Sequence, residues 1–340
     1  MIELGELSAH IAKILSLSTL GFLLATCVTP IYTFFAYNLN WWKKERTTSV
    51  TGEKLSVIKK LNARNYQVPT MAGMIMVVAV TAVTFAFNLS REQTWLPLAA
   101  LIGGGLVGLL DDIINVRGSG KGVAGLRAPI KFAMITTVAS IAAWFFYYKL
   151  GYNTIHLPFI GDFTVGLFLI PIFVLAVVST GNAVNISDGL DGLAGGLLLS
   201  AYTTFGIIAL LQGNYGISAF CFTVAGTLLS YVWFNIPPAR FFMGDVGSFS
   251  MGTSLGVIAM LTDTLILLPI ICLVFVLEAG STLAQITSKK FLGRRIFIAA
   301  PIHHHLEASG WEKTKVTMRF WLLGIICSLF GLMLAVTGGF

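Results

Sequence analysis

The segment GLFLIPIFVLAVVSTGNAVNISDGLDGLAGGLLLSAYTTFGIIALL, residues 166 to 211, consists of two long apolar runs joined by a short polar turn. Each run is long enough to cross a hydrocarbon core of about 30 Å as a helix. The turn holds two asparagines and two aspartates, Asn182, Asn185, Asp188 and Asp191. The segment therefore predicts two membrane-spanning helices whose connection carries unusual chemistry.

The composition of the whole chain agrees with a membrane protein. Of its 340 residues, 56% are hydrophobic and 11% are charged, and the mean hydropathy is +0.83. One soluble core cannot bury so many apolar side chains. We expect a single polytopic domain over residues 1–340 that is all α-helical, because open sheet edges cannot be satisfied in lipid. The acidic start, MIELGELSAH, does not match a cleavable signal.

About ten segments are predicted to span the membrane. They are residues 15–37, 70–88, 95–110, 132–149, 163–181, 193–211, 216–234, 246–262, 264–286 and 319–337. The eighth, at 246–262, is the weakest because it is short and rich in serine, threonine and glycine.

Lysine and arginine set the orientation of such a bundle. If the connections alternate between two sides, all but three of the 22 basic residues fall on one side, the exceptions being Lys13, Arg91 and Lys149. That side is predicted to be cytoplasmic, so both termini are expected outside. The aspartate-rich turns and the histidines fall on the cytoplasmic side too. A one-sided site differs from that of a transporter, whose ionisable residues usually lie near the midplane.

Four polar groups on this side are candidates for chemistry. Adjacent carboxylates such as Asp111 and Asp112 repel one another unless a cation is near, and Lys131 follows in the next loop. A solvated helix end is the ordinary alternative. The group therefore predicts a metal or base site with phosphate-binding cations beside it.

The turn after residue 181 spaces Asn182, Asn185, Asp188 and Asp191 by three residues each. Such spacing keeps side chains roughly on one helix face, although glycines make a turn equally possible. Their oxygens suit a hard cation such as Mg²⁺, which keeps several waters and binds substrate phosphates. Helix capping would explain one or two of the four.

The third and fourth groups are FFMGDVGS and APIHHHLEASGWEKTKV. Asp245 lies between glycines near an expected helix start, where Gly244 lets backbone approach a ligand. The aromatic Phe242 could stack on a planar base or anchor the membrane interface. Three consecutive histidines lack zinc-site spacing, and imidazoles donating to phosphate fit this basic loop better. Together these groups indicate phosphoryl chemistry between a soluble polyanion and a lipid.

The motifs NAVNISDGLDGLAGG, FFMGDVGS, LLDDI and APIHHHLEASGWEKTKVTMRFW resemble those of the polyprenyl-phosphate N-acetylhexosamine-1-phosphate transferases, grouped as glycosyltransferase family 4. The triple histidine resembles the phospho-N-acetylmuramoyl-pentapeptide transferase branch. The similarity runs from about residue 69 to 321. It implies a Mg²⁺-dependent enzyme that moves phospho-N-acetylmuramoyl-pentapeptide from its uridine nucleotide onto undecaprenyl phosphate, with UMP and lipid I as products. It further implies a homodimer in the bacterial inner membrane with a cytoplasmic active site.

The resemblance also assigns roles to individual positions. It implies catalytic roles for Asp111, Asp112, Asp188, Asp245 and His303, with Asp111 deprotonating or orienting the lipid phosphate. It implies substrate contacts for Thr70, Lys131, Asn182, Asn185, Asp188, Asp191, Asn235, Phe242, Gly244, Gln285, His303, His304 and His305, and metal ligation by Asp245 and Asn185.

Departures from the family pattern and other functions stay open. The stretch VPTMAG places Ala72 where the family usually has a glycine, and the departures from the family pattern cover residues 43–73 and 117–131, which bears on substrate preference. A sister enzyme that uses UDP-N-acetylglucosamine would share the acids but not the histidines. A transporter would need mid-span ionisable groups, and only Glu278 is one. The net charge of +7 is explained by anionic lipid and nucleotide, so no nucleic-acid partner is expected.

Overall fold

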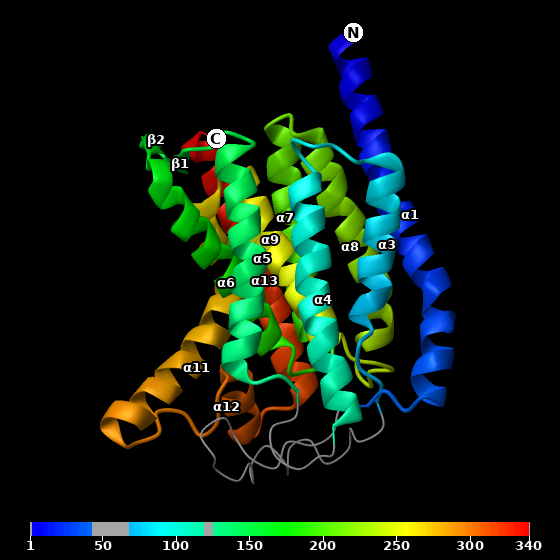
Figure 1. The fold of residues 1–340 in the computed structure, drawn as a ribbon, viewed down its shortest axis with the longest axis vertical. Coiled ribbons are helices and arrows are strands. Elements are labelled where there is room, and N and C mark those ends of the chain that lie inside the picture. The colour runs from blue at the N-terminus through cyan, green and yellow to red at the C-terminus, as the bar shows by residue number, and fades with distance from the viewer. Residues whose placement is uncertain (1, 43–67, 119–124, 340) are drawn as a thin grey trace.

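The computed structural model describes residues 2–42, 68–118 and 125–339, which form a helical bundle with one small hairpin (Figure 1). The long elements are α1 (Ile2–Asn38), α3 (Gly73–Phe87), α4 (Trp95–Arg117), α5 (Ala128–Tyr148), α6 (Leu169–Ser187), α7 (Leu193–Leu211), α8 (Tyr215–Asn235), α9 (Gly244–Leu261), α11 (Leu273–Leu292) and α13 (Lys313–Gly338). The short ones are β1 (Thr154–Leu157), β2 (Gly161–Thr164), η1 (Gly166–Phe168), η2 (Leu265–Leu267), α10 (Leu268–Ile271) and α12 (Ile302–Ala308).

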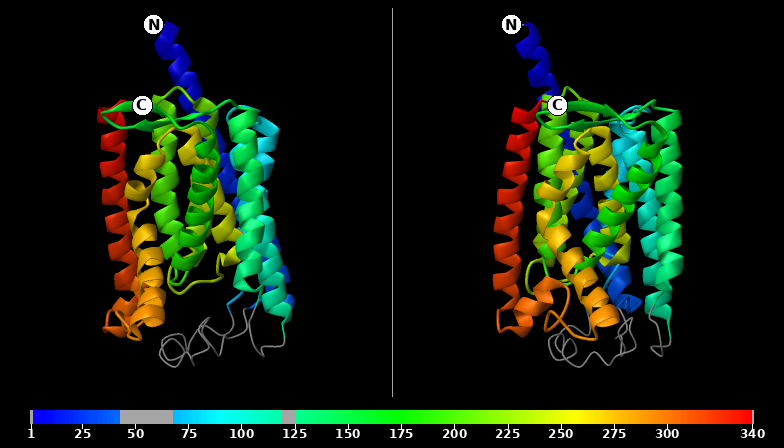
Figure 2. Two further views of the ribbon diagram at one scale, coloured as in Figure 1. Left: turned by 60° about the vertical axis from the view of Figure 1, so that its left-hand side comes forward. Right: turned by 90° about the vertical axis from the view of Figure 1, so that its left-hand side faces the viewer.

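These helices confirm the all-α membrane class. Within the described residues, seven helices are long and apolar enough to cross a membrane, or up to eight if α10 and α11 count as one bent span. The shorter α3 and the polar α9 do not meet that criterion, but both run along the bundle beside the others (Figures 1 and 2). Ten crossings therefore stay a prediction, which depends on α3, on α9 and on the bent pair of α10 and α11.

The innermost of the long helices is α9, which is rich in serine, threonine and glycine. Every residue of α9 from Gly244 to Leu261 is buried, and α9 packs most extensively against α4 and α6. Its hydroxyls are satisfied by carbonyl oxygens, as where Thr253 Oγ1 donates to Ala100 O at 2.9 Å. Close approach depends on small residues, because a Cβ on Gly108 would collide with the backbone of Asp245. A helix surrounded by protein needs small and satisfied side chains rather than lipid-soluble ones.

The glycines of α4 therefore pack inside the protomer. A Cβ on Gly103 would meet Val138 of α5 at 2.8 Å, and one on Gly105 would meet Ser250 of α9 and Val77 of α3 at 3.4 Å. These glycines permit close packing between helices of one chain, so they do not support the expected homodimer. The homodimer stays a prediction.

Two features differ from the sequence expectation. The span expected from residue 163 begins at Gly166, where η1 leads into α6, because residues 154–164 form an antiparallel hairpin in which Ile155 pairs with Phe163. The span expected over 264–286 is not straight: α10 ends at Ile271, Cys272 leaves the helical conformation, and α11 continues at an angle of 81°. As a result α11 leaves the bundle and projects outward (Figure 1).

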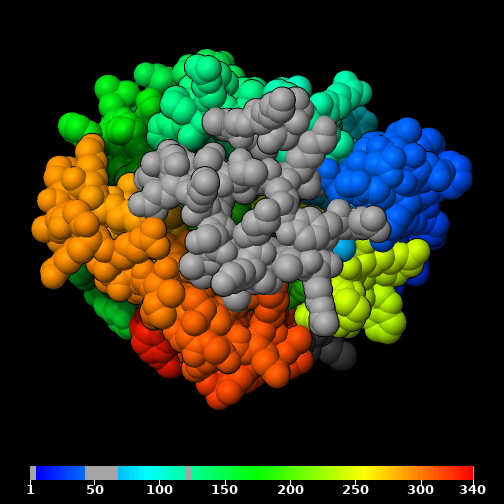
Figure 3. All heavy atoms as spheres, turned by 90° about the horizontal axis from the view of Figure 1, so that it is seen from below, coloured from blue at the N-terminus to red at the C-terminus, as the bar shows by residue number. Residues whose placement is uncertain are grey.

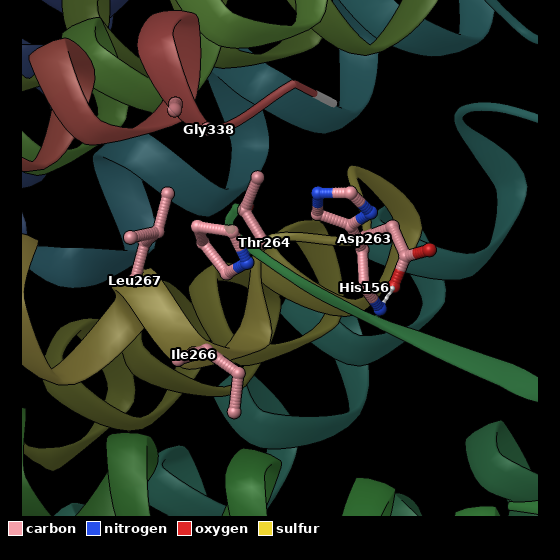
Figure 4. A pocket seen from close by; sticks show the side chains of 8 residues that line it. His156, Asp263, Thr264, Ile266, Leu267 and Gly338 are labelled. Carbon is pink, nitrogen blue, oxygen red and sulfur yellow. Dashed lines mark hydrogen bonds between the residues drawn. The ribbon is translucent and has the colours of Figure 1, made fainter. Parts of the chain in front are cut away.

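Both termini lie at the same end of the bundle as the hairpin, with the C-terminus beside the hairpin and the start of α1 extending beyond the other helices (Figures 1 and 2). A small pocket of about 10 Å³ at this end is lined by the hairpin, the start of η2 and the end of α13. There the backbone N–H of His156 donates to Asp263 Oδ1 at 3.0 Å (Figure 4). The pocket is about the size of one water molecule, and the polar groups predicted to do chemistry lie at the opposite end.

Candidate active site

One lysine joins two of the predicted acids. Lys131, in the first turn of α5, places Nζ 2.7 Å from Asp111 Oδ2 and 2.6 Å from Asp245 Oδ2. The three side chains come from α5, α4 and α9, and all are largely shielded from solvent. Two carboxylates this close to one another require a cation between them. The structure thus brings together three residues that are far apart in the sequence.

The adjacent aspartates face different partners. The second oxygen of Asp111, Oδ1, accepts the backbone N–H of Leu126 at 2.6 Å. Asp112 is fully buried, and its Oδ2 accepts the backbone N–H of Val246 at 3.1 Å, in the first turn of α9. Helix N-termini carry unsatisfied N–H groups that favour anions. Asp111 is therefore turned toward the lysine, whereas Asp112 fixes the start of the helix that carries Asp245.

The stretch before α3 lines the same helix start. Phe242 N donates to Pro69 O at 2.8 Å, and Ala72 N donates back to Phe242 O at 3.0 Å. Gly244 has a φ of +74°, and a Cβ there would meet Asp112 Oδ2 at 2.5 Å and Thr70 Oγ1 at 2.8 Å. Only glycine adopts this conformation in this space without strain. The Oγ1 of Thr70 is buried and has no hydrogen-bond partner among the described residues.

The two phenylalanines before Gly244 have different surroundings. Phe241 is fully buried, edge-on to Tyr32 at 5.4 Å and beside Tyr231 and Phe234. Phe242 is partly exposed at the site end. Phe241 is therefore a core residue, and Phe242 is the ring of this pair that a ligand can reach.

The asparagines at the end of α6 hold different positions. Asn185 Nδ2 donates to Ser248 Oγ at 2.9 Å, one turn beyond Asp245 on α9. This bond turns the carbonyl oxygen of the Asn185 amide away from Ser248. Asn182 Nδ2 donates instead to Val178 O of its own helix at 2.8 Å. The structure thus links Asn185 to the helix of Asp245 and leaves Asn182 bonded locally.

The turn between α6 and α7 is fixed by hydrogen bonds to the end of α8 and the loop that follows it. Asp188 directly follows the last residue of α6, and Asp191 Oδ2 accepts the backbone N–H of Ala239 at 3.1 Å. Burial raises the pKa of the Asp191 carboxyl above its usual value, with the Ala239 bond acting against that rise. Asn235 accepts Gly192 N at 2.9 Å and donates to Phe241 O at 2.8 Å. Both polar atoms of the Asn235 side chain are used inside the protein, which gives it a positioning role.

The three histidines lie on α12, whose side chains have separate partners. His303 Nδ1 lies 2.7 Å from Glu278 Oε2 of α11. His304 Nδ1 lies 2.6 Å from Glu307 Oε2, and burial lowers the pKa of His304 although the Glu307 carboxylate opposes this. His305 Nδ1 accepts the backbone N–H of Ile298 at 3.3 Å. The cluster thus contains two histidine–glutamate pairs.

A polar stripe on α11 holds the chain that leads to α12. The stripe consists of Glu278, Ser281, Gln285 and Ser288, which are all buried on a helix whose other faces are largely exposed. Gln285 Oε1 accepts the N–H groups of Ile296 and Phe297, and its Nε2 donates to Phe297 O. Gln285 therefore fastens the 294–301 loop, just as Asn235 fastens the α6–α7 turn. Spacings of three and four residues are the sequence signal for this stripe.

Seen from the site end, α11, α12, the 236–240 loop and the end of α1 surround the face (Figure 3). The basic segment 43–64 and Lys121, which sequence reasoning placed here, lie outside the described residues. Within those residues, no three histidine, cysteine, aspartate or glutamate side chains group as metal ligands. The Asp245 carboxylate and the Asn185 amide oxygen are hard donors on the facing helices α9 and α6. Two such ligands suit Mg²⁺, which takes its other ligands from water and substrate phosphates.

Comparison with known proteins identifies the family. The model of the family described as "Glycosyl transferase family 4" matches residues 94–263. The chain is 40% identical over 285 residues to the phospho-N-acetylmuramoyl-pentapeptide-transferase of Chloroflexus aggregans, covering 80% of this chain and 78% of the relative. The chain belongs to glycosyl transferase family 4. The protein of the same name from Bartonella quintana is 36% identical to this family 4 member over 284 residues, with 78% of each chain covered.

Family membership confirms the resemblance predicted from the motifs. The matched region of this family 4 chain contains Asp111, Lys131, Asn185 and Asp245, and the histidines lie beyond it. The roles of individual residues in catalysis and binding stay predictions, with Asn235 and Gln285 now placed in supporting positions.

Proposed function

We propose that this family 4 member is a phospho-N-acetylmuramoyl-pentapeptide transferase. It transfers phospho-N-acetylmuramoyl-pentapeptide from UDP-N-acetylmuramoyl-pentapeptide to undecaprenyl phosphate, which gives lipid I and UMP. The observation that carries the proposal is the Lys131 ammonium between Asp111 and Asp245, at one end of a membrane bundle. The names of the relatives at 36–40% identity support the choice of substrate.

The residues divide the phosphoryl transfer between them. An oxygen of the lipid phosphate attacks the β-phosphorus of the nucleotide, a new P–O bond forms, and the bond to the α-phosphate breaks with UMP as the leaving group. Asp111 orients the lipid phosphate or takes its proton, and Lys131 neutralises the charge that gathers on the transferred group. Phe242 stacks on the uracil. A route through an aspartyl-phosphate is the alternative.

We further propose that Asp245 and Asn185 hold Mg²⁺. The metal would supply charge neutralisation to the diphosphate when bound. Support comes from the donor set, which consists of one carboxylate and one amide oxygen on facing helices. The Lys131 ammonium already binds this carboxylate, so the position suits a positive charge. Asp112 holds the first turn of α9 in place for this pair.

The proposal includes an orientation. The site end is placed at the cytoplasmic face of the bacterial inner membrane, with both termini outside, in line with the distribution of lysine and arginine. Both substrates are then accessible, the nucleotide from the cytosol and undecaprenyl phosphate from the inner leaflet. Labelling of single cysteines, one in the hairpin at 158–160 and one at the tip of α11, by an impermeant maleimide on intact cells tests this placement. Reaction at the hairpin alone is expected, and reaction at the α11 tip alone would reverse the orientation.

The test of function is UMP release by the purified protein in detergent. Release should require UDP-N-acetylmuramoyl-pentapeptide, undecaprenyl phosphate and Mg²⁺ together. Release from UDP-N-acetylglucosamine instead would assign the chain to the sister branch of the family. The histidines on α12 favour the first outcome, because the resemblance of this motif is to the pentapeptide-using branch.

A further inference from the structure

Glu278 and His303 form a buried pair. Both residues are 0% exposed, and the carboxylate oxygen Oε2 lies 2.7 Å from Nδ1 of the ring. Glu278 comes from α11, just beyond the 81° bend, and His303 comes from the second position of α12. The bend directs α11 toward α12, so the fold itself brings the two groups together.

The opposite side of the ring faces the turn after α6. His303 Nε2 is buried and has no hydrogen-bond partner among the described residues. It lies directly against Gly189, where an added Cβ would collide with Nε2 and Cε1 of the ring. Gly189 follows Asp188, the residue directly after α6. One ring nitrogen is thus fixed by a carboxylate and the other is presented to the turn that carries the predicted substrate residues.

Physical reasons explain why this arrangement is specific. A buried carboxylate is costly unless it is paired and hydrogen-bonded, so Glu278 needs the histidine as much as the histidine needs it. The hydrogen bond made by one ring nitrogen decides which nitrogen carries the proton and how the ring is oriented. With Nδ1–H directed to Glu278, Nε2 faces the turn, and it donates to an anion when it carries a proton as well. Among the described residues, the ionisable groups close to the pair include His304, whose ring centroid lies 4.2 Å from that of His303, its partner Glu307, and Asp188 next to Gly189.

We propose that Glu278 is a positioning residue of the transferase. It holds His303 with Nδ1–H on the carboxylate, so that a ring protonated on both nitrogens presents Nε2–H at the Asp188–Gly189 turn and donates it to a phosphate oxygen of the anionic substrate. Gly189 has no side chain because the ring occupies that space. The inference rests on the proposed transferase function but adds a residue that does not itself contact substrate.

The test compares Glu278→Gln with wild type in steady-state UMP release. Glutamine keeps the size and one acceptor oxygen, so the fold is retained while the carboxylate is lost. We expect kcat to fall about tenfold or more, the KM for the nucleotide to stay within about twofold, and the Tm to change little. In a His303→Asn background the same substitution should have almost no further effect, because the two residues act as one unit. Glu92→Gln, an exposed carboxylate at the opposite end, is the control.

Two results would overturn the inference. One is a kcat for Glu278→Gln equal to that of wild type, and the other is the same fold-loss in both His303 backgrounds. If Glu278→Gln does not give folded protein, Gly189→Ala tests the other side of the ring. The inference is supported if Gly189→Ala lowers kcat in wild type but causes no further loss of kcat in the His303→Asn background. An unchanged kcat for Gly189→Ala contradicts the inference. Failure of wild type to release UMP from either nucleotide sugar would instead overturn the proposed function.

Discussion

The ammonium of Lys131 lies 2.6 Å from the Asp245 carboxylate, although the two residues are 114 positions apart in the chain. The same nitrogen reaches Asp111 at 2.7 Å. Three helices of the bundle therefore converge on one cation, and the electrostatics of the site depend on it.

Replacing Lys131 by methionine removes this cation and leaves Asp111 facing Asp245. We expect kcat for UMP release to fall about 100-fold or more, because charge stabilisation of a transferred phosphoryl group is lost. Stopped or coupled assays of UMP release measure the change. Lys149→Met, at the opposite end of α5 and stacked on Trp144, is the matched control and should keep full activity. Equal activity of the two variants would contradict the assignment of Lys131.

Substitution of Gly108 by alanine tests the packing of α4 on α9. The new Cβ collides with the backbone of Asp245, so the helices must separate at the level of the site. Overpacking of this kind costs about 1–3 kcal/mol, and both the Tm and the activity should fall. Gly280→Ala is the control, because nothing lies within 4 Å of that Cβ. A Tm for Gly108→Ala as high as that of Gly280→Ala would contradict the packing.

Asn235 is expected to act through the two backbone groups that it holds. Asn235→Ala leaves Gly192 N and Phe241 O without their partners, at a cost of about 1–3 kcal/mol for each buried group. We expect a lower Tm together with a higher KM for the nucleotide, since the turn and Phe242 both lose support. Asn235→Asp keeps an acceptor for Gly192 N, so its Tm and its KM should lie between those of wild type and of Asn235→Ala. A raised KM with an unchanged Tm would instead indicate direct substrate contact.

The stability of the protein should depend on pH through His304. Burial lowers the pKa of His304 below its ordinary value of 6.5, so the unfolded chain takes up the proton more readily than the folded chain. Stability is then fully present above the ordinary value and is lost as the pH falls through it toward the lower folded value. The Tm should fall between about pH 7 and pH 5, with a shallower fall in His304→Gln. His10→Gln on α1 is the control, and identical slopes for wild type and His304→Gln would contradict the prediction.

The bundle was predictable because apolar length is a direct consequence of the membrane. Hydropathy was nevertheless misleading about importance: residues 246–262 gave the weakest predicted span, yet α9 is buried along its whole length. Hydropathy measures the free energy that a helix gains on transfer from water to lipid. Because α9 is surrounded by other helices and not by lipid, its low hydropathy says little about its burial. The break at Cys272 was not predictable, because no glycine or proline stands at that position. The hairpin at 154–164 was missed because strands of four residues give almost no periodic signal.

The candidate site was predictable in its residue types but not in its contacts. Asp111, Lys131 and Asp245 were each recognised from local motifs, but spacing along the chain cannot say that one lysine joins both acids. Asn235 and Gln285 were predicted to contact substrate from the family resemblance, and the structure shows that their amides hold loops. Glu278 was recognised from the sequence as an ionisable group inside a predicted span. Its partner, His303 of α12, could not be predicted because the contact depends on the bend in α11.

The most direct test of the central claim is identification of the lipid product. Purified protein is incubated with UDP-N-acetylmuramoyl-pentapeptide, undecaprenyl phosphate and Mg²⁺, and the lipid fraction is analysed by mass spectrometry beside an Asp245→Asn variant. The account predicts undecaprenyl-diphosphate carrying N-acetylmuramoyl-pentapeptide, formed in equal amount with UMP by wild type and absent from the variant. A lipid carrying a different sugar, or an unchanged yield from Asp245→Asn, would contradict it.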